Sequence, residues 1–233
     1  MPTPVTHLLF DMDGLLLDTE RVYTEVTQEI LSRFGKTFTW DIKSKMMGAK
    51  ERDAAELLIA HYGIEGYTAD EYLKQRNALH EAKFPFCKPL PGVLELVSHL
   101  QANKVPICVA TSSHRIAFHL KASRNSELFS LFGGHIVCGD DKGILKGKPA
   151  PDIFLAGARD IGFEDVDYSK CLVFEDAPSG VRAGLAAGCQ VVWIPDAQLE
   201  LDPELVGKCA KVLKSMEDFD PAEFGLPAFP SAS

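Results

Sequence analysis

Carboxylates, hydroxyls and one lysine stand where predicted strands end, and these residues could do chemistry. The strand predicted at 5–10 runs directly into Asp11-Met12-Asp13-Gly14. Two carboxylates two positions apart point the same way while strand geometry lasts, and they repel each other unless a cation or a shared proton compensates. A plain Asp-Gly turn is the alternative interpretation. An EF-hand calcium loop counted from Asp11 would need Gly and Glu where Leu16 and Val22 stand, so that pattern fails.

Three further strand ends carry polar residues. Thr111-Ser112-Ser113 offers hydroxyls and backbone N–H groups that could cradle an anion, although such residues also cap helices. Glu175-Asp176 forms a second acidic pair, which suits a magnesium site or, alternatively, a cap before the next helix. Lys148 lies in a proline-fixed loop, where a plain surface lysine is the alternative. Ligands bind at the carboxyl ends of strands in open α/β sheets, so the four features together indicate one site.

The elements that must position these residues alternate along the chain. Short apolar runs predict strands, and amphipathic segments opened by Pro or closed by Gly predict helices between them. The order predicts an α/β fold, a doubly wound parallel sheet of the Rossmann-like kind. The predicted strands are 5–10, 105–110, 135–138, 171–174 and 191–194, and the predicted core helices are 93–100, 151–161 and 178–187.

One interval breaks the alternation. From Thr19 to about Lys88 the pattern is helical only, with apolar stripes at Val22-Val26-Ile30-Phe34 and at Ala54-Leu57-Leu58-His61, and a weaker helix at 72–84. We therefore expect an α/β core domain over residues 1–18 and 89–233, interrupted by a helical insertion over 19–88. The tail from about Asp218 is expected to pack as irregular structure.

Composition narrows the function classes. The chain has 233 residues, with 24 Lys+Arg against 33 Asp+Glu and a formal net charge of −9. This acidic balance argues against a nucleic-acid polymer or a membrane surface as partner, because such surfaces bind clustered Lys and Arg. No signal peptide or membrane-length apolar run is visible, and the six cysteines show no metal-ligand spacing. We expect a cytoplasmic protein with buried, reduced thiols, working as a monomer.

The motifs together resemble those of the haloacid dehalogenase superfamily, in its phosphatase branch with a helical cap inserted after the first strand. The resemblance covers essentially the whole chain. It rests on Asp11-Met12-Asp13-Gly14 through Asp18-Thr19-Glu20, Ala110-Thr111-Ser112-Ser113, Gly147-Lys148-Pro149, and Phe174-Glu175-Asp176-Ala177-Pro178-Ser179-Gly180.

The resemblance implies a role for each motif residue. Asp11 would be the nucleophile that forms an aspartyl-phosphate, and Asp13 the general acid and base. Thr111, Ser112 and Lys148 would bind the phosphate, with Lys148 as the catalytic cation. Mg²⁺ would be the cofactor, held by Asp11, the Asp13 carbonyl and Asp176, with Glu175 behind these ligands.

The implied substrate is a small phosphorylated metabolite. The resemblance extends into residues 171–176, 218–221 and 224–227, and through these segments it implies pseudouridine 5′-phosphate. FMN, a hexose phosphate and glycerol phosphate stay admissible. The alternatives are a sugar- or glycerol-phosphate phosphatase, a beta-phosphoglucomutase-type phosphomutase, and a catalytically idle binding protein. A dinucleotide oxidoreductase is disfavoured, because no GxGxxG follows the first strand. Four cap residues could face the substrate or be solvated charges, namely Lys50, Arg52, His80 and Lys83.

Overall fold

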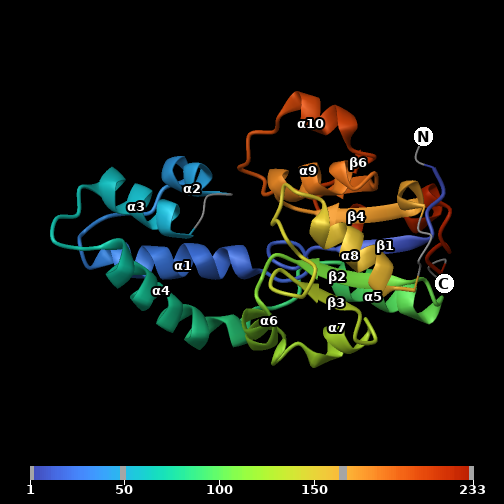
Figure 1. Ribbon diagram of the computed structural model, residues 1–233, viewed down its shortest axis with the longest axis horizontal. Coiled ribbons are helices and arrows are strands. Elements are labelled where there is room, and N and C mark those ends of the chain that lie inside the picture. Colours follow the sequence, from blue (N-terminus) through green and yellow to red (C-terminus); the bar gives the residue numbers. More distant parts are fainter. Residues whose placement is uncertain (1–2, 48–50, 163–166, 231–233) are drawn as a thin grey trace. The chain divides into compact units, whose positions relative to one another are not determined.

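The protein, seen in a computed structural model, is described over residues 3–47, 51–162 and 167–230 (Figure 1). The chain divides into two compact units, one of Met1–Asp18 with Lys88–Ser233 and the other of Thr19–Cys87. Lys88, expected in the insertion, falls in the larger unit, where its carbonyl accepts a hydrogen bond from the Asp18 N–H at 2.9 Å.

The larger unit is built on a six-stranded parallel sheet in the order β3-β2-β1-β4-β5-β6. Strands step outward from β1 in one direction and, from β4 on, in the other, so the topological switch point lies between β1 and β4. The doubly wound parallel sheet is thereby confirmed. The sixth strand was not predicted from the sequence, because it has only two residues, both half-buried, and contains no apolar run. The strands are β1 (His7–Phe10), β2 (Ile107–Thr111), β3 (Ile136–Cys138), β4 (Cys171–Glu175), β5 (Gln190–Trp193) and β6 (Lys211–Val212).

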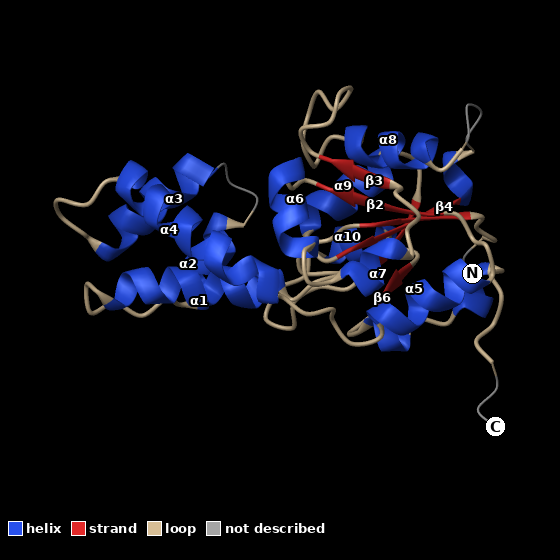
Figure 2. Ribbon diagram, turned by 90° about the horizontal axis from the view of Figure 1, so that it is seen from below, coloured by secondary structure: helices blue, strands red, loops and turns tan. Residues whose placement is uncertain are grey.

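Helices cover both faces of this sheet, with α8 on one side of the strands and α5 on the other (Figure 2). The predicted core helices correspond to α5, α8 and α9. No helix among the described residues is long and apolar enough to cross a membrane. The core helices are α5 (Val93–Ala102), α6 (Arg115–Ala122), α7 (Ser126–Ser130), α8 (Asp152–Asp160), α9 (Pro178–Ala186) and α10 (Pro203–Lys208).

The stripe of small residues in α9 lets this helix approach the sheet closely. A Cβ added at Gly184 would lie 2.9 Å from Val191 Cγ2 and 3.2 Å from Val173 Cγ1, so no larger residue fits there without movement. The helix ends before Gly188, whose φ of 81° lies in the left-handed region that glycine adopts without strain. Close packing fixes α9 directly behind the end of β4.

Aromatic rings support the two central strands from the other face. Phe10 stacks on Phe174 with ring centroids 4.7 Å apart, and Phe174 meets Phe219 edge-on at 4.9 Å. Phe219 in turn contacts Phe224 at 5.2 Å, so the tail packs here in short 3₁₀ turns. Phe10 directly precedes Asp11 and Phe174 directly precedes Glu175. The chemistry-bearing residues therefore follow strand ends that are held by a rigid cluster.

The smaller unit contains helices and, among its described residues, no strand. Its first helix buries Val22, Val26 and Ile30 as the stripe predicts, whereas Phe34 lies beyond the helix end and is 36% exposed. In α3 the predicted Leu58 is buried together with Ala55, whereas Leu57 and His61 of the predicted stripe are exposed. The helices are α1 (Thr19–Ser32), α2 (Trp40–Met46), α3 (Glu51–Tyr62) and α4 (Ala69–Lys83).

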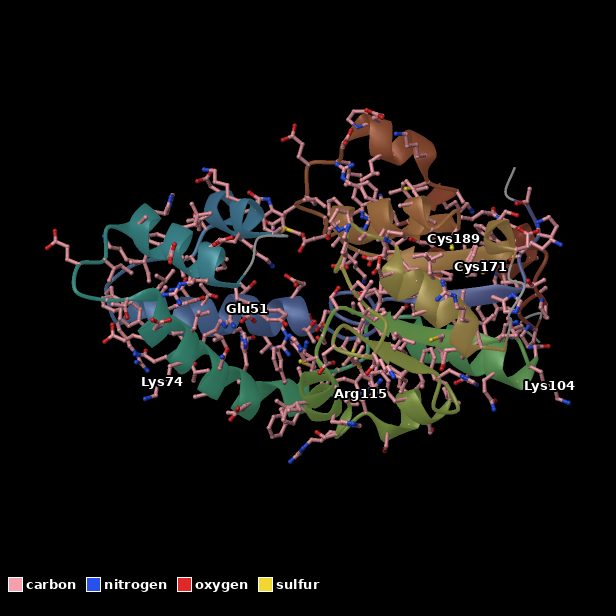
Figure 3. All side chains as sticks on the ribbon, in the orientation of Figure 1. Glu51, Lys74, Lys104, Arg115, Cys171 and Cys189 are labelled. Carbon is pink, nitrogen blue, oxygen red and sulfur yellow. The ribbon has the colours of Figure 1, made fainter. Side chains whose placement is uncertain are left out.

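All six cysteines are free thiols, as predicted, and all but the half-buried Cys209 are buried. Cys171 and Cys189 lie side by side at the start of β4 and β5 (Figure 3), with their thiols in hydrogen-bond contact. Burial raises the pKa of the Cys138 thiol to about 11, which keeps it protonated and unreactive near neutral pH. We therefore assign the buried cysteines a role in packing and not in catalysis.

Candidate active site

Asp11 is the first residue after β1 and lies at the topological switch point of the sheet. Its backbone N–H donates to the carbonyl of Phe174 at 3.1 Å, so the ladder between β1 and β4 continues one step past the strand. The residue is only 5% exposed. A buried carboxylate at the carboxyl edge of a parallel sheet stands where ligands bind in this class of fold.

Lys148 lies between two buried carboxylates. Its Nζ pairs with Asp11 Oδ1 and, at 2.6 Å, with Glu175 Oε1. Burial alone would lower the pKa of Lys148, but the Asp11 and Glu175 carboxylates outweigh it and raise that pKa above its ordinary value. Lys148 is therefore a fixed positive charge, which its loop presents to the residue following β1. Buried charges persist only when paired in this way.

The site disfavours ionisation of the Asp11 carboxyl. Burial raises the pKa of Asp11 from 3.8 to about 7, Lys148 opposes that rise, and the charges of Glu175 and Asp13 add to it. Burial, with the neighbouring carboxylates, therefore outweighs the effect of Lys148 on this carboxyl. A further cation close to Asp11 would favour the ionised form.

The carboxylates of Asp11, Glu175 and Asp176 offer oxygens that all lie within 4.8 Å of one another. Several carboxylate oxygens in one place suit a hard divalent cation such as Mg²⁺. Glu175 is already engaged, because Oε1 meets Lys148 and Oε2 accepts from the N–H groups of Asp176 and Ala177, each at 3.1 Å. The donor set fits Mg²⁺, with Asp11 and Asp176 better placed than Glu175 to be ligands.

Glu175 can occupy this position only because residue 180 is a glycine. A Cβ built on Gly180 in α9 would lie 1.7 Å from Glu175 Oε1 and 1.9 Å from its Cδ. No side chain fits there unless the carboxylate moves. Gly180, the last residue of the motif that begins at Phe174, thus makes room for the partner of Lys148.

We expect Gly180→Ala to lower both turnover and stability, because the added methyl group must displace the Glu175 carboxylate. Overpacking of a buried position costs about 1–3 kcal/mol. The matched control is Gly207→Ala in α10, where an added Cβ meets nothing within 4 Å. Thermal unfolding and steady-state kinetics of both variants measure the difference. Wild-type stability and turnover in Gly180→Ala would contradict the account of Glu175.

The side chain of Asp13 is held at both oxygens. Oδ1 accepts from Lys121 Nζ at 2.6 Å, and Oδ2 accepts from Ser113 Oγ at 2.8 Å. Lys121 Nζ also donates to Ser113 Oγ at 2.9 Å, so the three groups form a closed network. This network joins the end of β1 to the loop after β2 and to α6.

The end of β2 and the loop after it carry the predicted phosphate-binding residues Thr111 and Ser112, and the next residue, Ser113, contacts Asp13. Thr111 is fully buried at the end of β2, and its Oγ1 accepts from the Ser113 N–H at 3.0 Å, while Ser112 is exposed. Gly139 packs against this loop so closely that a Cβ there would lie 2.4 Å from the Ser112 carbonyl oxygen. The hydrogen bond from Ser113 to Thr111 and the close packing of Gly139 therefore fix the backbone of this loop, while the side chain of Ser112 stays exposed to solvent.

One residue of the site was not found from the sequence. Lys121 is 1% exposed and touches two of the residues that were predicted, Asp13 and Ser113. The sequence holds one sign that Lys121 is buried. It follows Phe118 by three positions, so both side chains lie on the same face of α6, and this face is buried. A charge on an apolar helix face is a cue for a buried partner, but the sequence does not say which carboxylate that partner is.

The cap residues considered as substrate contacts are mostly engaged elsewhere. Arg52 is exposed and pairs with Asp70 and Glu56. Lys83 pairs with Glu29 at 2.9 Å. The buried ring of His80 packs on Tyr23 and Phe84, and Lys50 lies outside the described residues.

Comparison with known proteins agrees with the geometry. Residues 5–188 match the haloacid dehalogenase-like hydrolase family. The "Probable pseudouridine-5′-phosphatase" of Drosophila melanogaster is 47% identical over 97% of this chain and 96% of its own length. The "(DL)-glycerol-3-phosphatase 2" of Arabidopsis thaliana is 46% identical over 97% of this chain and 93% of its own.

A solved structure shows the same fold with an anion bound. A HAD family hydrolase from Deinococcus radiodurans R1, described with bound phosphate and sodium, superposes with a TM-score of 0.79 at 26% identity. The superposition covers 98% of this chain and all of that one. These matches confirm the resemblance inferred from the four motifs. The chain belongs to the haloacid dehalogenase-like hydrolase family, and within it the chain groups with phosphatases.

Proposed function

We propose that this protein is a Mg²⁺-dependent phosphomonoester hydrolase that works through an aspartyl-phosphate on Asp11. The observation that carries the proposal is the pairing of buried Asp11 with Lys148 at the switch point of the sheet, beside Glu175 and Asp176. A carboxylate with a fixed cation is a nucleophile suited to an anionic substrate. The family to which the chain belongs supports this assignment.

Each predicted residue has a task in this reaction. The phosphoryl group would be bound by Lys148 and the hydroxyl and N–H groups of the 111–113 loop, which take up the negative charge of the transition state. Asp11 would attack phosphorus. Asp13 would protonate the leaving alcohol and then take a proton from the water that hydrolyses the aspartyl-phosphate.

The cation would be held by the Asp11 and Asp176 carboxylates and the Asp13 carbonyl. Mg²⁺ supplies neutralisation of the charge that otherwise keeps a carboxylate and a phosphate apart. Glu175 supports this arrangement indirectly, since it fixes Lys148 with one oxygen and the backbone of Asp176 with the other.

We propose a small phosphorylated metabolite as substrate, with pseudouridine 5′-phosphate and glycerol 3-phosphate as the first candidates. Two relatives of nearly equal similarity carry these two names, so the choice rests on assay. We also propose a monomer in the cytoplasm, where six free thiols stay reduced.

The experiment is a panel of phosphate esters assayed for inorganic phosphate with Mg²⁺ and with a chelator. We expect Mg²⁺-dependent phosphate release from at least one candidate and from p-nitrophenyl phosphate. Conversion of a sugar phosphate into its isomer without phosphate release would identify a phosphomutase instead. An inert protein on every ester would overturn the proposal.

Removal of Mg²⁺ should lower the stability of the folded protein more at pH 8 than at pH 6. Because the pKa of Asp11 is raised to about 7, the folded chain without metal loses stability as the pH rises from about 4 to 7, where the buried carboxylate ionises. Mg²⁺ replaces the proton, so we expect it to raise the unfolding temperature clearly at pH 8 and weakly at pH 6. Thermal unfolding with Mg²⁺ or a chelator measures both shifts. A larger shift at pH 6 would contradict this account.

A further inference from the structure

Lys121 is the most deeply buried lysine side chain among the ion pairs of the described residues. Its side chain is 1% exposed, against 21% for its partner Asp13. An ammonium group so far from water must be compensated by hydrogen bonds, and two are present, to Asp13 Oδ1 and to Ser113 Oγ. The surface ion pairs of this chain impose no such desolvation penalty.

A buried lysine–carboxylate pair is weak evidence for stability. Desolvation of two charges can exceed their attraction, and apolar side chains of similar size often serve a core as well. What the pair does provide is a defined geometry, because Lys121 and Ser113 each bind one oxygen of Asp13 and also bind each other. The position of Lys121 therefore points to the carboxylate it holds.

The backbone under Lys121 is itself fixed. The buried side chain of Asn125 donates from Nδ2 to the Lys121 carbonyl at 3.0 Å, beyond the end of α6. On the other side, Phe118 in the same helix meets the ring of Phe129 edge-on at 5.2 Å. The lysine thus projects from an anchored turn, so its Nζ is a fixed point for the Asp13 carboxylate.

We propose that Lys121 is a positioning residue that, with Ser113, holds the Asp13 carboxylate in its catalytic orientation. This rests on the proposed function, in which Asp13 exchanges protons with the leaving alcohol and the attacking water. With one oxygen held by Lys121 and the other by Ser113, the carboxylate cannot rotate about its side-chain bonds without breaking both contacts. Proton transfer depends on such alignment.

The test is a double-mutant cycle between Lys121→Met and Asp13→Asn. Methionine keeps the length of the side chain and removes the ammonium group. We expect Lys121→Met alone to lower kcat by about 10- to 100-fold, as misplacement of a catalytic group does, with KM little changed. In the Asp13→Asn background the same substitution should change kcat by no more than about twofold, since its target is already removed.

The matched control is Lys170→Met. Lys170 forms an exposed pair with Asp167 at 3.7 Å, before the start of β4 and thus at the opposite end of the strand from the site. This variant loses a lysine–aspartate pair of the same kind and should keep wild-type kcat. Ser113→Ala removes the second anchor without burying anything new, and should lower kcat by about 2- to 10-fold, the value of one hydrogen bond. If Lys121→Met does not fold, Ser113→Ala is measured in the wild type and in the Asp13→Asn background, where its effect on kcat should shrink to about twofold or less. This comparison separates the contact of Ser113 with Asp13 from a contact of its hydroxyl with the phosphate.

The outcomes separate this inference from the proposed function. If Asp13→Asn turns over like the wild type, the role of Asp13 and the proposal for Lys121 both fall. If Asp13→Asn is slow and Lys121→Met slows it by its full factor again, Lys121 acts on something other than Asp13, and only this inference is overturned. Unchanged kcat in folded Lys121→Met, or in Ser113→Ala where that variant is the test, also overturns it.

Discussion

Replacement of Asp11 by Asn should reduce phosphomonoester hydrolysis by about 10⁴-fold or more, the scale of loss seen when an enzyme loses its nucleophile. The amide keeps the size and shape of the side chain, but it cannot form an acyl phosphate. The neutral amide also cannot form an ion pair with Lys148. Initial rates of phosphate release from p-nitrophenyl phosphate and from the best ester of the panel measure this effect.

The control for this variant must separate chemistry from folding. Asp160→Asn in α8 removes an exposed carboxylate that pairs with His135 at 3.0 Å, and it should leave turnover unchanged. Thermal unfolding of Asp11→Asn should show a cooperative transition, because the substitution removes a carboxylate whose ionisation the fold disfavours. A folded Asp11→Asn protein with more than a few per cent of wild-type turnover would rule out Asp11 as the nucleophile.

Replacement of Asp13 by Asn should slow hydrolysis by about 100- to 10,000-fold, the usual contribution of a positioned acid or base. The size of the loss should depend on the leaving group. An alkoxide such as that of glycerol needs a proton as the bond to phosphorus breaks, whereas p-nitrophenolate leaves readily without one. We therefore expect kcat/KM to fall much further for glycerol 3-phosphate than for p-nitrophenyl phosphate.

The reason for using kcat/KM is that it reports the steps up to transfer of the phosphoryl group, before water enters. Mg²⁺ binding should partly survive in Asp13→Asn, since the predicted contact of this residue to the cation is its backbone carbonyl. Equal losses for the aryl and alkyl esters would indicate that Asp13 does not protonate the leaving group.

The sequence sufficed for the sheet and for the strand-end motifs because both depend on local patterns. Apolar runs such as 171–174 predict buried strands, and a parallel sheet brings their carboxyl ends to one edge. The position of Asp11 beside Glu175 follows from β1 and β4 being neighbours. The short β6 and α2 lack a full apolar period, so no local pattern predicts them.

The contacts that complete the site could not be predicted in the same way. Lys121 meets Asp13 across 108 positions of sequence, and only the three-dimensional packing of α6 selects that partner. The resemblance implied that Asp176 rather than Glu175 binds the cation, but the pairing of Glu175 with Lys148 appears only in the structure. Gly180 shows the same limit, since a small residue in a helix gives no sign that a carboxylate lies 1.7 Å from its missing Cβ.

The central claim is that Asp11 carries the phosphoryl group during turnover, and the most direct measurement is to locate the adduct. The enzyme is mixed with substrate and Mg²⁺, quenched during the first turnover, and treated with borohydride, which reduces an acyl phosphate of aspartate to homoserine. Peptide mass spectrometry then reads the modified position. The account predicts reduction at residue 11 and at no other aspartate; a modified residue elsewhere, or phosphate release with no adduct at Asp11, would contradict it.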